Sequence, residues 1–302
     1  MAASSRRGCT CLGVRMRTLM KPRRADQLSA ESHRAAVDPV SAQLVSRLAR
    51  ERSRFRLIVH VSQISILVVC LLLWQWLIDA GIGMAFFFSR PSDIGKFLYE
   101  AVLTGSLWAD TAVTLGATLI GFVVGSVLGI GVGLIVARSP TLDAILDPYL
   151  GILNSLPRIA LAPLFLLWFG LGISSKIALS ISLVFFVVAI NARAGAIGVP
   201  SDYITVARTL GASEWQRFVK IVVPGSVPSI FAGLRLGVVY SLLGVVTGEM
   251  IAAKAGLGVQ LTFLAGTFQI AGVFGILVIL AIIAVVLNWL MAVAESRLLR
   301  WR

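Results

Sequence analysis

Two charged side chains, Arg158 and Glu249, lie inside long apolar stretches of the sequence, and Asn154 precedes Arg158 by one helical turn. A guanidinium in such a place can bind an anionic solute, and a carboxylate can gate a pathway. At about 1.5 Å per residue, Arg158 stands roughly 20 Å into its apolar segment. A charge at that depth is costly unless it faces a cavity or a partner. The three residues are therefore candidates for a solute pathway. A structural role stays open for Arg158, which can bond carbonyl groups freed by Pro157, and for Glu249, which can pair with a cation.

Residue patterns that carry out catalysis are missing from the sequence. It has no G-x-x-x-x-G-K followed by Ser or Thr, the loop that cradles nucleotide phosphates. It also has no metal triad and no nucleophile elbow. Cys9 and Cys11 form a lone C-x-C without the further Cys or His ligands that a metal needs. We expect no catalytic residue, no metal site and no bound cofactor, so energy for any work must come from a partner.

The composition excludes an ordinary soluble domain. Hydrophobic residues make up 58% of the 302, and charged residues only 14%, whereas a soluble domain has about 25% charged residues. Of the 27 Lys and Arg residues, thirteen lie within residues 1–56. A basic block before the first apolar run is typical of the cytoplasmic side of a membrane protein and attracts anionic lipid. Phe55 is its one aromatic residue, and this scarcity of aromatic residues argues against nucleic-acid binding. The composition thus predicts a disordered or loosely helical arm, 1–56, and a membrane domain, 57–302.

Six apolar segments each reach the roughly 20 residues that a helix needs to cross the hydrocarbon core. They predict an all-α integral membrane fold. Pro157 and Pro163 are expected to kink the third segment. The predicted spans are Leu57–Ile78, Ala112–Ala137, Ala144–Phe169, Ile177–Ala196, Ile230–Ala252 and Gly272–Ala294.

The distribution of Lys and Arg sets the orientation. With the N-terminus inside, the outside loops hold only Arg90, Lys96, Lys176 and Lys254, and most other basic residues fall inside. The positive-inside rule then puts both termini in the cytoplasm. The first outside loop contains an amphipathic stretch, Ile94 to Leu103, with Ser92 as its expected N-cap.

Glycines recur every four residues along the second apolar segment. A stripe of this kind lies on one helix face and lets another helix approach closely, so it predicts helix packing rather than a solute site. Its members are Gly121, Gly125, Gly129 and Gly133.

The longest inside loop, about 197–229, carries signals for two short helices. Ser201 is placed to cap the first helix, Tyr203–Leu210, which ends at Gly211. Ser213 and Gln216 then form a capping box at the start of the second.

Pro224 and Pro228 are expected to end that second helix before the membrane resumes. The pair needs a surface to pack against, either its own helical bundle or a partner, and its residues alone do not decide which. Its apolar residues are Tyr203, Val206, Leu210, Trp215, Phe218 and Val219.

This loop resembles the signature of permease subunits in binding-protein-dependent ATP-binding-cassette (ABC) importers. The family pattern is E-A-A, three residues, G, nine residues, I-x-L-P. Thr205-Val206-Ala207, Gly211 and Ile221-Val222-Val223-Pro224 match it at every spacing, with Thr205 where the family usually has Glu. The resemblance runs from about Ser89 to the C-terminus. It includes the segments Leu156–Leu164 and Ala207–Ala212, which look like the nitrate, sulfonate, bicarbonate and taurine branch.

The resemblance implies a six-span type I importer permease in the bacterial inner membrane. It implies a pore of two copies, cytoplasmic ATPase subunits that bind ATP and Mg²⁺, and an extracytoplasmic solute-binding protein that delivers a small, anionic solute. The loop 201–224 would couple ATP hydrolysis to a rigid-body change of access. The residues implied to dock the ATPase are Tyr203, Thr205, Val206, Ala207, Arg208, Leu210, Gly211 and Ala212.

An ion-coupled carrier or a channel is the alternative. A carrier is expected to show relays of ionisable residues or paired broken helices in two repeated halves. The sequence shows neither clearly, so the importer subunit is the preferred prediction.

Overall fold

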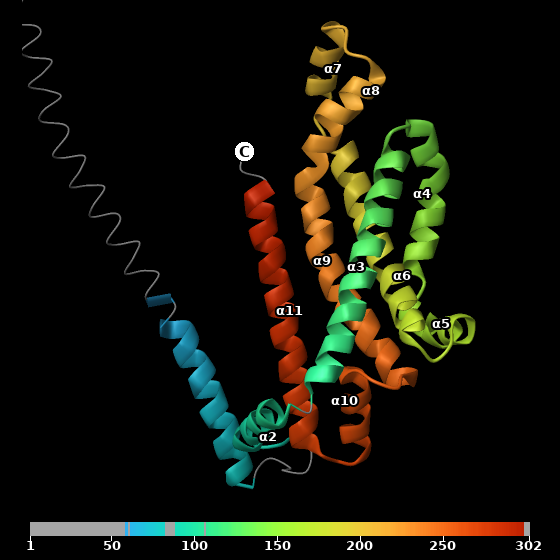
Figure 1. Ribbon diagram of the computed structural model, residues 1–302. Coiled ribbons are helices and arrows are strands. Elements are labelled where there is room, and N and C mark those ends of the chain that lie inside the picture. The colour runs from blue at the N-terminus through green and yellow to red at the C-terminus, as the bar shows by residue number, and fades with distance from the viewer. Residues whose placement is uncertain (1–57, 60, 82–87, 106, 299–302) are drawn as a thin grey trace, which may run out of the picture. The chain divides into compact units, whose positions relative to one another are not determined.

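The computed structural model describes residues 58–59, 61–81, 88–105 and 107–298 (Figure 1). The predicted basic arm, 1–56, lies outside them. The described residues form helices and no strand. These helices are Val61–Asp79, α2 (Pro91–Thr104), α3 (Trp108–Ala137), α4 (Pro140–Ser155), the 3-10 turn η1 (Arg158–Leu161), α5 (Ala162–Phe169), α6 (Ile173–Ile197), α7 (Ser201–Thr209), α8 (Glu214–Arg217), the π-helical turn η2 (Phe218–Val222), α9 (Val223–Ala252), α10 (Leu257–Gly266) and α11 (Ile270–Leu298).

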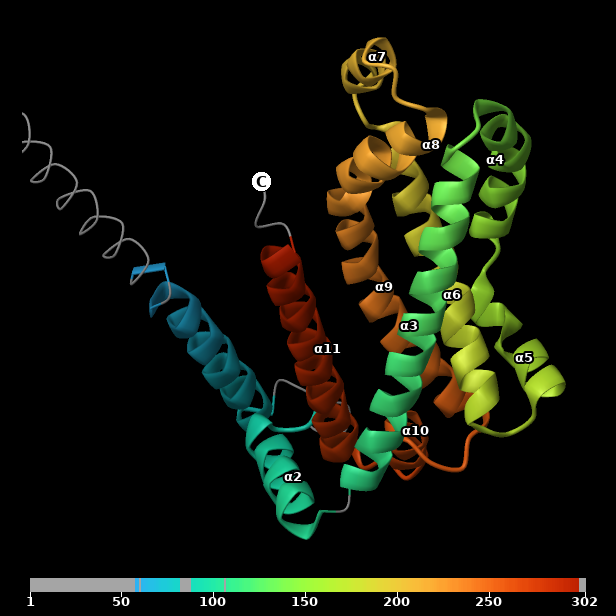
Figure 2. The ribbon, with the colours of Figure 1, turned by 45° about the horizontal axis from the view of Figure 1, so that its top comes forward.

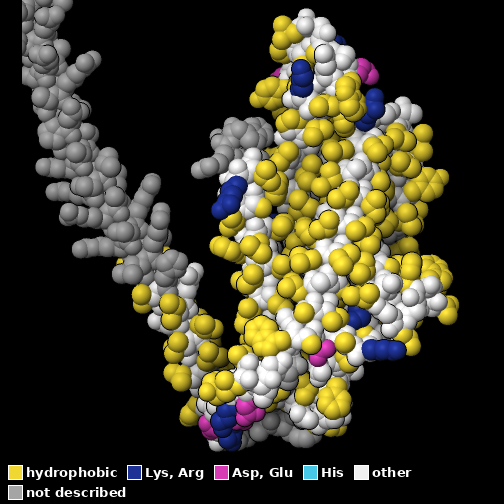
Figure 3. Space-filling model, viewed as in Figure 1, with side chains coloured by type: hydrophobic (Ala, Val, Ile, Leu, Met, Phe, Trp, Pro, Cys, Tyr) yellow, Lys and Arg dark blue, Asp and Glu magenta, His cyan; other side chains and the backbone are white. Residues whose placement is uncertain are grey.

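Five of the described helices are long and apolar enough to cross a membrane, and α4 with the η1–α5 arm adds a sixth span if the bent pair crosses as one. This agrees with the predicted all-α fold. Hydrophobic side chains cover the middle of the face seen in Figure 3, and charged side chains gather toward its two ends. Four of the predicted spans lie within longer helices, namely α3, α6, α9 and α11. The helices are longer because each continues beyond its apolar run.

The predicted third span, Ala144–Phe169, is not one kinked helix. Its two arms, Pro140–Ser155 and Arg158–Phe169, are bent by 75°. Leu156 is extended, with φ −64° and ψ 133°, because the ring of Pro157 disfavours helical geometry in the residue before it. Pro163 does not kink a helix either. It stands in the first turn of α5, where its missing N–H has no helical partner to lose.

Helix α6 is the centre of the bundle and packs extensively on both α3 and α9 (Figure 1). The predicted glycine stripe faces α6. A Cβ built on Gly125 would come within 2.8 Å of the Val184 side chain, and one on Gly129 within 2.7 Å of the Phe185 carbonyl oxygen. Because no side chains intervene, the two backbones approach closely, as the stripe predicts.

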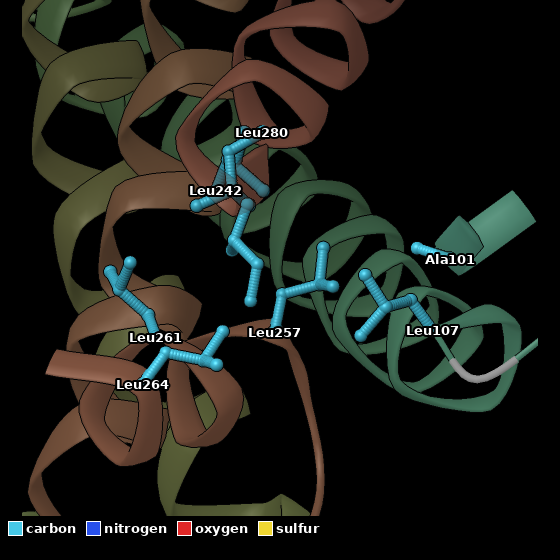
Figure 4. Close-up of a cluster of buried hydrophobic side chains, with 8 residues drawn as sticks. Ala101, Leu107, Leu242, Leu257, Leu261, Leu264 and Leu280 are labelled. Atoms are coloured by element: carbon cyan, nitrogen blue, oxygen red, sulfur yellow. The ribbon is translucent and has the colours of Figure 1, made fainter. Parts of the chain in front are cut away.

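Helix α10 was not predicted, because its ten residues are too short to register as a span. It lies beside α9 and α11 at the end of the bundle that also holds α2. A cluster of buried side chains from α2, α9, α10 and α11 fixes it there, as Figure 4 shows for Leu242, Leu257, Leu261 and Leu280.

The amphipathic stretch before the second span is helical, as predicted, and forms α2. Its predicted cap is wrong. Arg90 occupies the N-cap position and Pro91 the first turn. Pro91 fits the first turn well, since the N–H it lacks would have no partner there.

Candidate functional site

Helix α7 begins directly after Pro200, which occupies the N-cap position without a side-chain bond. The predicted cap, Ser201, is already the first helical residue. Its carbonyl oxygen accepts a hydrogen bond from the Thr205 hydroxyl at 3.0 Å. Thr205, where the resemblance expects Glu, is exposed and bonds within its own helix.

Gly211 ends the first loop helix, as predicted, and its left-handed backbone is the reason. Its φ is +80°. The N–H of Gly211 donates to the Arg208 carbonyl and the N–H of Ala212 to the Ala207 carbonyl, each at 3.0 Å. These paired bonds form a Schellman motif, in which the left-handed position favours glycine. A Cβ on Gly211 would meet nothing within 4 Å, so glycine is required by the turn of the chain and not by crowding.

The second loop helix starts with the predicted capping box. The Ser213 hydroxyl accepts from the Gln216 N–H at 3.2 Å, and the Gln216 side chain accepts from the Ser213 N–H at 2.9 Å. The box satisfies two backbone donors at the start of α8.

The predicted end of that helix at Pro224 and Pro228 is wrong. α8 continues through η2 into α9, so one helical run extends from Glu214 to Ile251. Pro224 follows the π-helical turn and Pro228 lies inside α9. The wider π-helical turn changes the hydrogen-bond register just before Pro224, which cannot donate to a preceding carbonyl.

The apolar face of α7 and α8 is left largely uncovered by the described residues. Neither helix contains a buried residue, and Leu210 is 81% exposed. The pair stands beyond the ends of α3, α6 and α9 (Figure 2). Between the two helices is a hollow of about 300 Å³. It is lined by Ala207, Leu210, Gly211, Ala212, Gln216, Arg217, Lys220 and Ile221.

A cation–π contact connects the projecting helices α7 and α8 to α3, and two ion pairs connect α6 to α4 at the same end of the bundle. The guanidinium of Arg138, just after α3, lies over the Trp215 ring of α8. Arg193 of α6 holds the start of α4 through ion pairs with Asp143 and Asp147, the second at 2.6 Å.

Glu249 belongs to a buried network at the opposite end of the bundle, where its side chain is fully buried. Its carboxylate accepts from Lys176 Nζ at 3.2 Å, from the Thr114 hydroxyl at 2.9 Å and from the Gly258 N–H at 2.9 Å. Three spans and the start of α10 therefore meet at this carboxylate. Gly256 permits the approach, since its φ is +127° and a Cβ there would overlap the carboxylate.

Sequence reasoning gave Lys176 and Thr114 no role beside Glu249. The charge distribution predicts Lys176 in an outside loop, whereas the structure buries it in the first turn of α6. The sequence does carry one signal that could have predicted this ion pair. Lys176 and Glu249 have opposite charges and lie at the same predicted end of two spans.

Arg158 and Asn154 are brought together at the break between α4 and η1. The Arg158 Nη2 donates to Asn154 Oδ1 at 2.7 Å, to the Asn154 carbonyl at 3.1 Å and to the Leu153 carbonyl at 3.3 Å. The guanidinium lies 4.2 Å from the centroid of the Phe186 ring. The two residues share no hydrogen bond or ion pair with Glu249, so the three predicted pathway residues form two separate groups.

Among the described residues, no group of three or more His, Cys, Asp or Glu side chains is arranged to hold a metal ion.

Residues 125–300 match the family described as "binding-protein-dependent transport system inner membrane component". The chain is 31% identical over 234 residues to the putative aliphatic sulfonates transport permease protein SsuC of Bacillus subtilis, covering 78% of this chain and 85% of SsuC. It is 32% identical over 247 residues to the taurine transport system permease protein TauC of Escherichia coli, covering 79% and 88%. It is 31% identical over 235 residues to the riboflavin transport system permease protein RibX of Chloroflexus aurantiacus, covering 78% and 88%.

The fold is similar to a solved structure of the MetNI methionine ABC transporter in an inward-facing conformation. The TM-score is 0.52 at 22% identity, over 64% of this chain and 93% of the other. The matching segment begins within α3 and includes all of α6 and the projecting loop, residues 201–224. The chain therefore belongs to the family of binding-protein-dependent inner-membrane transport components, and is a multi-pass permease subunit of an ABC importer.

Proposed function

We propose that this subunit couples to a separate ATPase through residues 201–224 and forms the pathway for a small anionic solute. The observation that carries the proposal is the apolar face of α7 and α8, which projects from the bundle and is left largely uncovered by the described residues. An amphipathic helix of this kind fits an apolar groove on a partner. The residues assigned to docking are Tyr203, Thr205, Val206, Ala207, Arg208, Leu210, Gly211 and Ala212.

The ATPase binds ATP and Mg²⁺, and this chain binds no cofactor of its own. The basic residues Arg138, Arg208, Arg217 and Lys220 stand near the projecting loop. By the positive-inside rule this end faces the cytoplasm, as do both termini, and the α2–α10 end faces the extracytoplasmic solute-binding protein.

A second copy of the chain completes the pathway. Helix α4 contains no buried residue, and its exposed apolar side chains include Ile145, Tyr149 and Ile152. A span so poorly covered by its own bundle is suited to line a pathway or a subunit boundary. Asn154 and Arg158 lie along this pathway, and the buried Glu249 contributes by shaping its outer end.

The anionic class of solute draws support from the sulfonate and taurine permeases, whose named solutes carry a sulfonate group. Relatives named for riboflavin and formylaminopyrimidine show that the family's solutes vary. Ligand screening of the solute-binding protein that serves this permease identifies the solute.

Reconstitution tests the coupling. Proteoliposomes holding the permease and its ATPase, with binding protein and solute outside, are expected to accumulate solute only when ATP is enclosed. Vesicles with the permease alone are expected to accumulate none. Uptake by the permease alone, driven by an ion gradient, would show that the protein is an ion-coupled carrier and would overturn the proposal.

A further inference from the structure

The buried interior of the described chain holds one positive charge that no carboxylate neutralises. Its buried charged side chains are Arg158, Lys176 and Glu249. Lys176 and Glu249 form an ion pair, whereas Arg158 has none. An isolated charge at membrane depth is costly, and such residues in transporters usually face a partner or a solute.

The guanidinium of Arg158 has donors to spare. Of its five N–H donors, those on Nη2 bond the oxygens of Leu153 and Asn154. Nε is buried without an acceptor. The Phe186 ring stabilises the cation but does not neutralise it. The side chain therefore supports the end of α4 and still lacks a counter-charge.

Arg158 also lies where the span is broken. Non-helical backbone at membrane depth is tolerated only when it is buried in protein or lines a water-filled cavity. Transporters place solute sites at such discontinuous helices. Here the break adjoins α4, none of whose residues is buried in the single chain, so the joint borders a face that the chain itself does not seal.

We propose that Arg158, positioned by Asn154 and by the Phe186 ring, binds the anionic head of the transported solute, and that this head is a sulfonate. A sulfonate carries one negative charge, which matches the single unneutralised guanidinium. Its oxygens can accept charge-assisted hydrogen bonds from Nη1, whose donors bond no described oxygen and which is not among the buried unpaired atoms. This inference rests on the proposed function and names the residue that recognises the solute.

The test measures binding of radiolabelled ethanesulfonate to the permease–ATPase complex in phosphatidylcholine nanodiscs. Wild type is expected to bind it saturably, and the uncharged ethanesulfonamide is expected not to displace it. Arg158→Gln is expected to weaken binding at least about tenfold, which is the loss of about 1.4 kcal/mol. Arg235→Gln is the matched control, because it removes a span arginine that pairs with Glu295, and it is expected to change binding by less than about twofold.

Asn154→Asp separates recognition from a purely structural role. It places a carboxylate at the position whose oxygen lies 2.7 Å from Arg158 Nη2, and so supplies an internal counter-charge. We expect this variant to melt at or above the wild-type temperature and yet to bind ethanesulfonate at least about tenfold more weakly. A purely structural Arg158 predicts unchanged binding instead.

Several results would overturn the inference: no saturable binding by wild type, displacement by the uncharged amide, wild-type binding by Asn154→Asp, or a lower melting temperature for that variant. The last contradicts the premise that Arg158 lacks a counter-charge. These results are independent of the coupling, because ATPase-independent uptake overturns the proposed function without changing which side chain binds the anion.

Discussion

The guanidinium carbon of Arg138 lies 5.4 Å from the centroid of the Trp215 ring. This cation–π contact joins the end of α3 to α8 in the projecting loop, so two segments far apart in the sequence are held together at the end of the bundle where we place the ATPase. A contact of this kind at a partly exposed site contributes about 0.5–1 kcal/mol. We therefore expect its loss to affect the proposed coupling and to leave folding intact.

Arg138→Gln is expected to reduce coupling rather than assembly. Loss of about 0.5–1 kcal/mol corresponds to a roughly two- to five-fold fall in solute transported per ATP hydrolysed. The measurement is the ratio of uptake to phosphate release in proteoliposomes. Arg138→Lys keeps the cation and is expected to retain most of the ratio. An unchanged ratio in Arg138→Gln would show that the contact carries no coupling.

Gly211→Val is expected to uncouple transport while membrane insertion stays normal. A β-branched residue is strained at φ +80°, and the left-handed conformation costs L-residues about 1–2 kcal/mol. We expect ATP-driven uptake to fall at least about tenfold, with less ATPase co-purifying. Gly116→Val is the control, since a Cβ there also meets nothing within 4 Å and the backbone is helical. Normal uptake by Gly211→Val would contradict the docking role of the loop.

Two glycines of α3 provide a matched test of helix packing. Gly129 faces α6, where a Cβ would lie 2.7 Å from a carbonyl oxygen of Phe185, and Gly131 faces open space. Gly129→Val is expected to destabilise the bundle by about 1–3 kcal/mol through overpacking, and Gly131→Val to have little effect. The measurement is the melting temperature of the two variants in the same detergent, which is expected to be lower for Gly129→Val. Equal melting temperatures would mean that α3 and α6 are not tightly packed.

The buried pair Lys176–Glu249 calls for a double-mutant cycle. Lys176→Met or Glu249→Gln alone is expected to cost about 3–5 kcal/mol, because each leaves a polar group buried without its partner. The double variant is expected to recover most of that loss. The partly exposed pair Arg235–Glu295 is the comparison, where single changes are expected to cost about 0–1 kcal/mol.

Unfolding in mixed detergent micelles measures these free energies. Additive losses at Lys176 and Glu249 would show that the two side chains do not act as a pair.

Local chemistry was enough to predict several features, although it misplaced the N-caps at Ser92 and Ser201. Gly211 and the pair Ser213–Gln216 were placed correctly because a left-handed turn and a capping box depend on neighbouring residues alone. The glycine stripe of α3 was interpreted correctly for a similar reason, since spacing of four fixes one helix face.

Sequence reasoning failed where the answer depends on backbone context or on distant residues. Pro157 predicts a disturbance but not its size, and the structure shows a 75° bend at which Arg158 bonds the carbonyls at the end of α4. Pro224 should have ended a helix, yet the π-helical turn before it keeps the run intact. The partnership of Lys176 with Glu249 joins residues far apart in the chain, and no local pattern reveals it.

One unbroken helical run, from Glu214 to Ile251, connects the projecting loop to the opposite end of the bundle. At about 1.5 Å per residue, the part of this run from Glu214 to Glu249 is roughly 52 Å long. Under the proposed coupling, a displacement of α8 by the ATPase would reach the opposite end of the bundle along one backbone, without crossing any loop. The π-helical turn beside Pro224 departs from the α-helical hydrogen-bond register, and turns of this kind are places where long helices bend.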